Sequence, residues 1–275
     1  MVKEFERNTF FKRLKSMLCV DFRRMLTTPL FYLTVATCFI VPIIILVMTT
    51  MMDGTESVNQ QTGEVTIIEG FKSVWEIIST VPKDANTEGA GMGMDMSLTS
   101  MCNINLLYFG LSLFVCMFIS ADFRSGYSKN LFSVRAGKSD YVISKTITCF
   151  FAGAVMIIAF FVGSIIGGAI MGLPFDPIEA GASIGGIIWC LLSKIGVVLV
   201  FVPIYVIISI ITKQRGWLAV LISLVAGMLL FAMIPMITPL NATIVHAGLT
   251  IGGGLLFSVG LGALSTLLLK KLPLV

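Results

Sequence analysis

Three short patterns in this sequence look like parts of nucleotide-binding or catalytic sites, and each lacks a component that the chemistry needs. Gly137-Lys138-Ser139 matches the end of a phosphate-binding loop, but that loop needs a glycine where Phe132 stands. Ser193 and Lys194 are neighbours, and adjacent residues of a helix point about 100° apart, so they cannot face each other as a catalytic dyad. His246 is the single histidine, which excludes the zinc-protease patterns. We expect no catalytic residue here; an intramembrane enzyme is the distant alternative.

Lys194 is the one charged residue between Glu179 and Lys213. A charge in the middle of a bilayer costs about 2.5–3.5 kcal/mol on insertion scales. The lysine therefore either reaches the interface or hydrogen-bonds between helices, or it lines a transport pathway. Asn103 and Asn105 are the other polar candidates for that pathway.

Soft sulfur ligands occur together at Met92, Met94 and Met96, with Met101 and Cys102 nearby. Thioethers suit Cu(I), and a flexible low-complexity loop is the alternative interpretation. No pair of the six cysteines has the spacing of a zinc site or points to a disulfide. We expect no metal site.

The elements that must position these residues are membrane spans. The chain is 56% hydrophobic and 12% charged, about half the charge of a soluble domain. Charge-free stretches long enough to cross a bilayer recur along it, and the last, from Gly216 to Leu269, would extend about 80 Å as one helix and must fold back near Pro235, Pro239 and Asn241. The sequence predicts an all-α integral membrane protein, a single domain over residues 1–275, with six spans: Leu30–Met52, Met101–Ala121, Thr146–Met171, Ala182–Thr212, Trp217–Met236 and Gly248–Leu269.

The distribution of Lys and Arg predicts the orientation. Seven lie before the first span and five between the second and third spans, and further pairs follow the fourth and sixth spans. The alternate segments hold only Lys72 and Lys83. The positive-inside rule then places both termini in the cytoplasm, in a multi-pass protein of the cell membrane.

Residues 1–26 are predicted to form an amphipathic interfacial helix, because Phe11, Leu14, Leu18, Phe22 and Met25 recur at helical spacing among basic residues. The helix either anchors the chain to the membrane surface or also braces a cytoplasmic partner. Residues 53–100 form a large extracellular loop, in which the spacing from Ile67 to Val81 predicts a short amphipathic helix.

Small residues recur at GxxxG spacing in the third and sixth spans, at Gly163–Gly167, Gly168–Gly172 and Gly248–Gly252. This spacing lets helix backbones approach closely in lipid. We expect packing inside one subunit more than dimerisation.

The segment between the second and third spans is the most informative. Asp122 ends a span, Gly126 follows four residues later, and Arg135, Tyr141 and Lys145 precede the next span. This order, with the basic leader, six spans and large first outer loop, resembles the permease subunit of ABC-2 type transporters, which have a type V exporter-like fold. Its size and leader most resemble exporters of amphipathic peptides, such as phenol-soluble-modulin exporters and lantibiotic-immunity permeases.

The resemblance implies that residues 122–145 hold a coupling helix, from Ser125 to Arg135, which docks into a separate ATPase subunit. The docking face would be Tyr127, Leu131 and Phe132, and the polar residues around it Arg124, Lys129, Asn130 and Arg135. Residues 1–26 would be the connecting helix beside the ATPase, and Ile237–Ala247 would form short re-entrant helices.

Two permeases, as copies or paralogues, and two ATPases would make the working unit. The partner would bind ATP and Mg²⁺, and this chain would need no cofactor of its own. Nothing in the sequence suggests nucleic-acid binding. The implied cargo is an amphipathic peptide or a similar hydrophobic substrate; a drug, a lipid-linked sugar, sodium or the cargo of copper-enzyme maturation are the alternatives.

Overall fold

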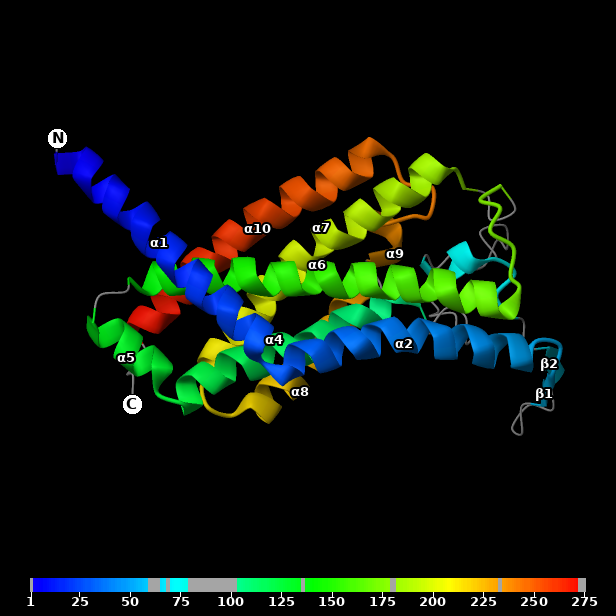
Figure 1. The fold of residues 1–275 in the computed structure, drawn as a ribbon, viewed down its shortest axis with the longest axis horizontal. Coiled ribbons are helices and arrows are strands. Elements are labelled where there is room, and N and C mark those ends of the chain that lie inside the picture. Colours follow the sequence, from blue (N-terminus) through cyan, green and yellow to red (C-terminus); the bar gives the residue numbers. More distant parts are fainter. Residues whose placement is uncertain are drawn as a thin grey trace.

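In a computed structural model of the chain, long helices lie alongside one another in one elongated bundle (Figure 1). The structure describes residues 2–58, 65–67, 70–78, 103–134, 137–178, 182–231 and 234–271. The α-helices are α1 (Val2–Thr27), α2 (Pro29–Met52), α4 (Leu107–Arg124), α5 (Tyr127–Val134), α6 (Lys138–Met171), α7 (Ile184–Thr212), α8 (Gly216–Phe231), α9 (Ile234–Ile237) and α10 (Ile244–Lys271). The short helix α5 and the C-terminal end of α10 lie at one end, called here the α5 end, and strands β1 and β2 lie at the opposite end.

Five helical segments of the described chain are long and apolar enough to cross a bilayer: Pro29–Met52, Ile104–Arg124, Lys138–Met171, Ile184–Thr212 and Ile244–Lys271. The stretch predicted as a fifth span, Trp217–Met236, contains the 16-residue helix α8 followed by the four-residue helix α9. A helix of this length reaches about 24 Å, which is less than the hydrocarbon core. The sixth crossing therefore stays a prediction.

Helix α6 begins at Lys138, earlier than the predicted start at Thr146, and this changes the position of several polar residues. Gly137 precedes it with an extended backbone as its N-cap. Tyr141, Ser144 and Lys145 therefore lie on the first turns of α6 instead of in a loop, and all three are buried.

Helices α2 and α6 pack closely at the predicted small-residue positions. A Cβ atom added to Gly163 would collide with the Phe39 carbonyl, and one added to Gly167 would lie 3.0 Å from the Cα of Ile43. This GxxxG pair therefore packs within the subunit, as expected. Gly248 and Gly252 on α10 have no described atom within 4 Å of such a Cβ.

Helix α1 packs against α6 with a stripe that shares Met25 with the predicted apolar face and is rotated from it toward Met17 and Asp21. Among residues 10–27, Met17, Asp21 and Met25 are buried, whereas Phe11 is exposed. These three follow one another at four-residue spacing and so lie on one stripe of the helix. The stripe contains a carboxylate because charged groups of α4 and α6 meet it there, as described below.

The segment predicted as a helix from Ile67 to Val81 has a different structure. Strands β1 (Glu56–Val58) and β2 (Val65–Ile67) pair in antiparallel fashion, with Ser57 opposite Thr66. A short 3₁₀ helix, η1 (Val74–Ile78), follows and buries its apolar residues over the end of α6, where Val74 lies against Gly168. Residues 59–64, 68–69 and 79–100, including Met92, Met94 and Met96, lie outside the described residues.

Candidate functional site: a buried charge network and a buried lysine

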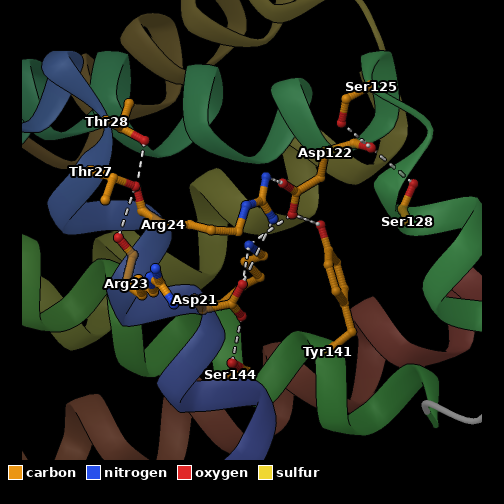
Figure 2. A network of polar contacts seen from close by, with 11 residues as sticks. Asp21, Arg23, Arg24, Thr27, Thr28, Asp122, Ser125, Ser128, Tyr141 and Ser144 are labelled. Carbon is orange, nitrogen blue, oxygen red and sulfur yellow. Dashed lines mark hydrogen bonds and ion pairs between the residues drawn. The ribbon is translucent and has the colours of Figure 1, made fainter.

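A network of buried charges joins three helices at the α5 end (Figure 2). Asp21 and Arg24 come from α1, Asp122 from the last turn of α4, and Lys145 from α6. Asp21, Asp122 and Lys145 are each 0% exposed, and Arg24 is 30% exposed. The network therefore connects α1, α4 and α6 immediately beside the start of α5.

Lys145 is the centre of this network. Its Nζ lies 2.7 Å from Asp21 Oδ1 and 2.7 Å from Asp122 Oδ2. The remaining carboxylate oxygens are also paired: Ser144 Oγ donates to Asp21 Oδ2 at 2.6 Å, and Arg24 Nη2 donates to Asp122 Oδ1 at 2.6 Å. The hydroxyl of Tyr141 donates a further bond to Asp122 Oδ2 at 3.1 Å.

Local helix geometry explains why these groups meet. Tyr141, Ser144 and Lys145 are spaced by three and four residues on α6 and so share one face. Asp122 stands at the C-terminal end of α4, where the helix dipole disfavours a carboxylate unless cations are present. Arg24 and Lys145 provide those cations.

The two carboxylates and the two cations balance in charge, and this balance reduces the free-energy cost of burying them. Isolated charges in a low-dielectric interior are very unfavourable, whereas a fully paired group is tolerated. Removing one partner of such a pair typically costs about 3–5 kcal/mol, because the other charge stays buried. The network therefore holds α1, α4 and α6 in one fixed arrangement.

Aromatic rings complete the network. The Arg24 guanidinium lies 4.1 Å from the centroid of the Tyr127 ring on α5, and Lys145 Nζ lies 4.3 Å from that of Phe118. Burial raises the pKa of the Tyr127 phenol, and the nearby Asp21 carboxylate adds to this, so the ring stays neutral. Burial by itself would lower the pKa of Arg24, but Asp122, Tyr127 and Asp21 together outweigh it and the pKa is raised. Arg24 is thus a permanent cation that holds the first residue of α5.

The structure places the predicted docking residues in two groups. Tyr127, Leu131 and Phe132 are half-buried, and Leu131 and Phe132 pack against the hydrophobic core. Arg124, Lys129 and Asn130 are exposed, and Arg135 lies outside the described residues.

Phe132 therefore has a structural reason to be apolar that sequence reasoning missed. Its ring packs edge-on against Tyr141, with centroids 5.4 Å apart, and Tyr141 is itself a member of the network. The docking role that the resemblance implies for Phe132 stays a prediction, and the ring contact described here is made within the chain. The exposed side of α5 carries Lys129 and Asn130, and Arg124 is exposed at the end of α4.

Lys194 lies in a second, separate polar cluster inside the bundle. It is 1% exposed, and its Nζ donates to Asn105 Oδ1 at 2.9 Å and to Thr238 Oγ1 at 3.0 Å. It therefore bonds between helices, which is one of the two predicted roles. Asn105 belongs to the 3₁₀ helix η2 (Ile104–Leu106), whose N-cap is Asn103; the Asn103 side chain accepts from the Asn105 backbone N–H at 2.9 Å.

The remaining patterns have structural roles in this fold. Ser193 Oγ donates to the Trp189 carbonyl at 2.8 Å, so no hydrogen bond joins it to the Lys194 side chain. Lys138 Nζ donates to the Leu269 carbonyl at 2.7 Å and fixes the end of α10 against the start of α6.

Asp21, Arg24 and Thr238 are the site residues that sequence reasoning missed. Asp21 carried a signal, since it stands four residues from both Met17 and Met25 on the buried stripe. No sequence pattern pointed to Thr238, because it lies in the break between α9 and α10, where neither helical nor strand periodicity applies.

An apolar helical bundle with buried, balanced charges at one end and a short helix beside them defines a multi-pass membrane protein. The family profile described as ABC-2 family transporter protein matches residues 22–230, and the chain therefore belongs to this family of membrane transport components. No curated protein and no solved structure matches the chain. The matched region contains Arg24, Asp122 and Lys145, and ABC-2 permeases generally pair with an ATPase subunit.

Proposed function

We propose that this chain is the permease of an ATP-binding-cassette exporter that moves an amphipathic peptide, or a similar hydrophobic substrate, out of the cell. A separate ATPase docks at α5 and supplies the energy, and two permeases and two ATPases form the working unit. The observation that carries the proposal is the network of Asp21, Asp122 and Lys145, because it joins the base of α5 to α1, α4 and α6.

The contacts of α5 show how a displacement of this helix would be transmitted to its neighbours. Gly126 has a φ of 72°, a conformation that favours glycine, and it forms the tight turn between α4 and α5. A displacement of α5 reaches α4 directly through this turn. It reaches α1 through the contact of Tyr127 with Arg24, and α6 through the contact of Phe132 with Tyr141. A soluble motor that moved α5 would therefore move three helices together.

The exposed residues at the α5 end indicate where the ATPase docks. Lys129 is exposed on α5 and Arg124 is exposed beside it, whereas Leu131 and Phe132 of α5 pack against the core of the chain. Exposed cations steer association with a partner surface of opposite charge. The α5 end is then cytoplasmic, which agrees with the distribution of Lys and Arg.

Assays of ATP hydrolysis and peptide export distinguish this proposed permease from an intramembrane enzyme. We expect the purified chain in lipid nanodiscs to hydrolyse no ATP, and the complex with its cognate ATPase to hydrolyse ATP and export an amphipathic peptide from vesicles. ATPase activity from the permease alone would contradict the proposal, and so would a complex that hydrolyses ATP without moving any amphipathic peptide. Vesicles loaded with a drug, a lipid-linked sugar or sodium distinguish the alternative cargoes.

A further inference from the structure

The polar cluster around Lys194 has more hydrogen-bond donors than acceptors. An ammonium group has three N–H donors, and the structure gives Nζ two acceptors, Asn105 Oδ1 and Thr238 Oγ1. Asn105 Nδ2 is buried and has no hydrogen-bond partner among the described residues. One ammonium N–H and the Asn105 amide N–H groups thus lie together inside the bundle without an acceptor.

Both acceptors of Lys194 are neutral. Thr238 Oγ1 gives its own proton to the Ile234 carbonyl at 2.9 Å, and the amide oxygen of Asn105 carries no formal charge. Within the described residues no ion pair reaches Lys194, and residues 103–121, 182–212 and 234–271 contain no Asp or Glu. The contrast with Lys145 is direct, since that buried lysine touches two carboxylates.

A buried cation beside an unsatisfied amide donor is complementary to an anion with two acceptor oxygens, such as a carboxylate. A carboxylate has two oxygens, so one can accept from Lys194 Nζ and the other from Asn105 Nδ2. It would also neutralise the lysine in a medium where an unpaired charge is costly. A neutral amide or a hydroxyl would supply an acceptor without the charge.

Of the three side chains, Thr238 lies beside the shortest element, because η2 continues directly into α4 as one helical segment from Ile104 to Arg124. Asn105 lies on the three-residue helix η2, and Thr238 follows the four-residue helix α9. Lys194 lies on the long helix α7, and the Tyr108 hydroxyl donates to its backbone carbonyl at 2.8 Å. Movement of α9 away from α7 would release one of the two bonds of the ammonium group and admit a ligand.

We propose that Lys194 and Asn105 form a carboxylate-binding site, with Thr238 as the group that occupies the lysine when no ligand is bound. The site deepens the proposed function, since a peptide cargo ends in a carboxylate that it would recognise. The existence of the unpaired cation does not depend on that function.

A double-mutant cycle on the purified full chain in neutral phosphatidylcholine nanodiscs tests the cation without ATPase or cargo. Asn105→Asp places a carboxylate beside Lys194 Nζ, and we expect it to raise the midpoint of thermal unfolding by about 3 °C. In the Lys194→Met background the same substitution buries a carboxylate without a partner, and we expect it to lower the midpoint. Destabilisation of equal size in both backgrounds would overturn the proposal and leave the exporter function intact.

The ligand class is tested with one synthetic amphipathic Leu/Lys peptide, prepared with a free C-terminal carboxylate and with a C-terminal amide. We expect wild-type nanodiscs to bind the free acid about tenfold more tightly than the amide, and Asn105→Asp and Lys194→Met to lose this preference. Lys270→Met removes an exposed cation at the α5 end and is the matched control that keeps it. Equal affinity for the two peptides in the wild type, or the absence of saturable binding, would overturn the assignment of a carboxylate ligand.

Discussion

Lys145 Nζ lies 2.7 Å from Asp122 Oδ2, and this contact joins the start of α6 to the last turn of α4 in the interior of the bundle. The same nitrogen lies 2.7 Å from Asp21 Oδ1, so a single ammonium group neutralises carboxylates from two helices. The arrangement couples the leader helix to the two spans that flank α5.

Lys145→Met should be the most damaging single substitution in the network. It leaves two buried carboxylates facing each other with only Arg24 as a cation, and we expect it to lower the free energy of unfolding by about 3–5 kcal/mol. Thermal unfolding of the purified permease measures the loss.

The double variant Asp21→Asn/Lys145→Met removes a carboxylate together with the ammonium group, and it should recover part of that stability. A Lys145→Met protein as stable as the wild type would show that the network contributes nothing to the fold.

Phe132→Asp should destabilise the permease itself as well as weaken any docking at α5. The ring packs against Tyr141 and the apolar core, and a carboxylate at this position would lose that packing and be partly buried without a cation. We expect a loss of about 2–4 kcal/mol, while Phe132→Leu keeps most of the packing and costs less than half as much. Equal unfolding midpoints for wild type and Phe132→Asp would contradict the packing described here.

We expect position 163 to tolerate no residue with a side chain. Gly163→Leu drives a side chain into the Phe39 carbonyl and separates α2 from α6, and we expect it to prevent a stable fold. Gly252→Leu is the control, since that position faces no described atom, and it should unfold near the wild-type midpoint. Similar behaviour of the two variants would show that α2 and α6 do not pack closely there.

The sequence predicts the long helices well because a membrane span is encoded by composition over many residues. The break between α8 and α10 was also predictable from Pro235, Pro239 and Asn241, although the re-entrant helices expected over Ile237–Ala247 were not found as such. The structure has α9 before that stretch, a non-helical break that contains Pro239, and α10 from Ile244 onward.

The charge network was less accessible to sequence reasoning, because it depends on which residues of different helices meet. Asp122, Tyr141 and Lys145 were noticed together as a pattern of the segment between two spans, but their common partner on α1 was not. The contact of Phe132 with Tyr141 could not be predicted for the same reason, because it depends on α6 beginning early enough to bring Tyr141 against the ring.

The orientation can be tested with reporter fusions. We expect a reporter after Lys271 and one at Asn130 to report the cytoplasm, and one at Gly89 to report the outside, because basic residues concentrate around the first two positions. A cytoplasmic signal from Gly89 would contradict both the six-span topology and the cytoplasmic assignment of the α5 end.

The central claim is that a separate ATPase docks on the exposed cations beside and on α5. The most direct measurement is the affinity of the purified permease for its cognate ATPase with Lys129→Glu and Arg124→Glu, compared with Lys270→Glu, which reverses an exposed charge at the same end of the bundle on α10. We expect the two α5-end variants to fold normally and to bind the ATPase at least about tenfold more weakly, and Lys270→Glu to bind as the wild type does. Undiminished binding by both α5-end variants would contradict the docking surface on which this account of coupling depends.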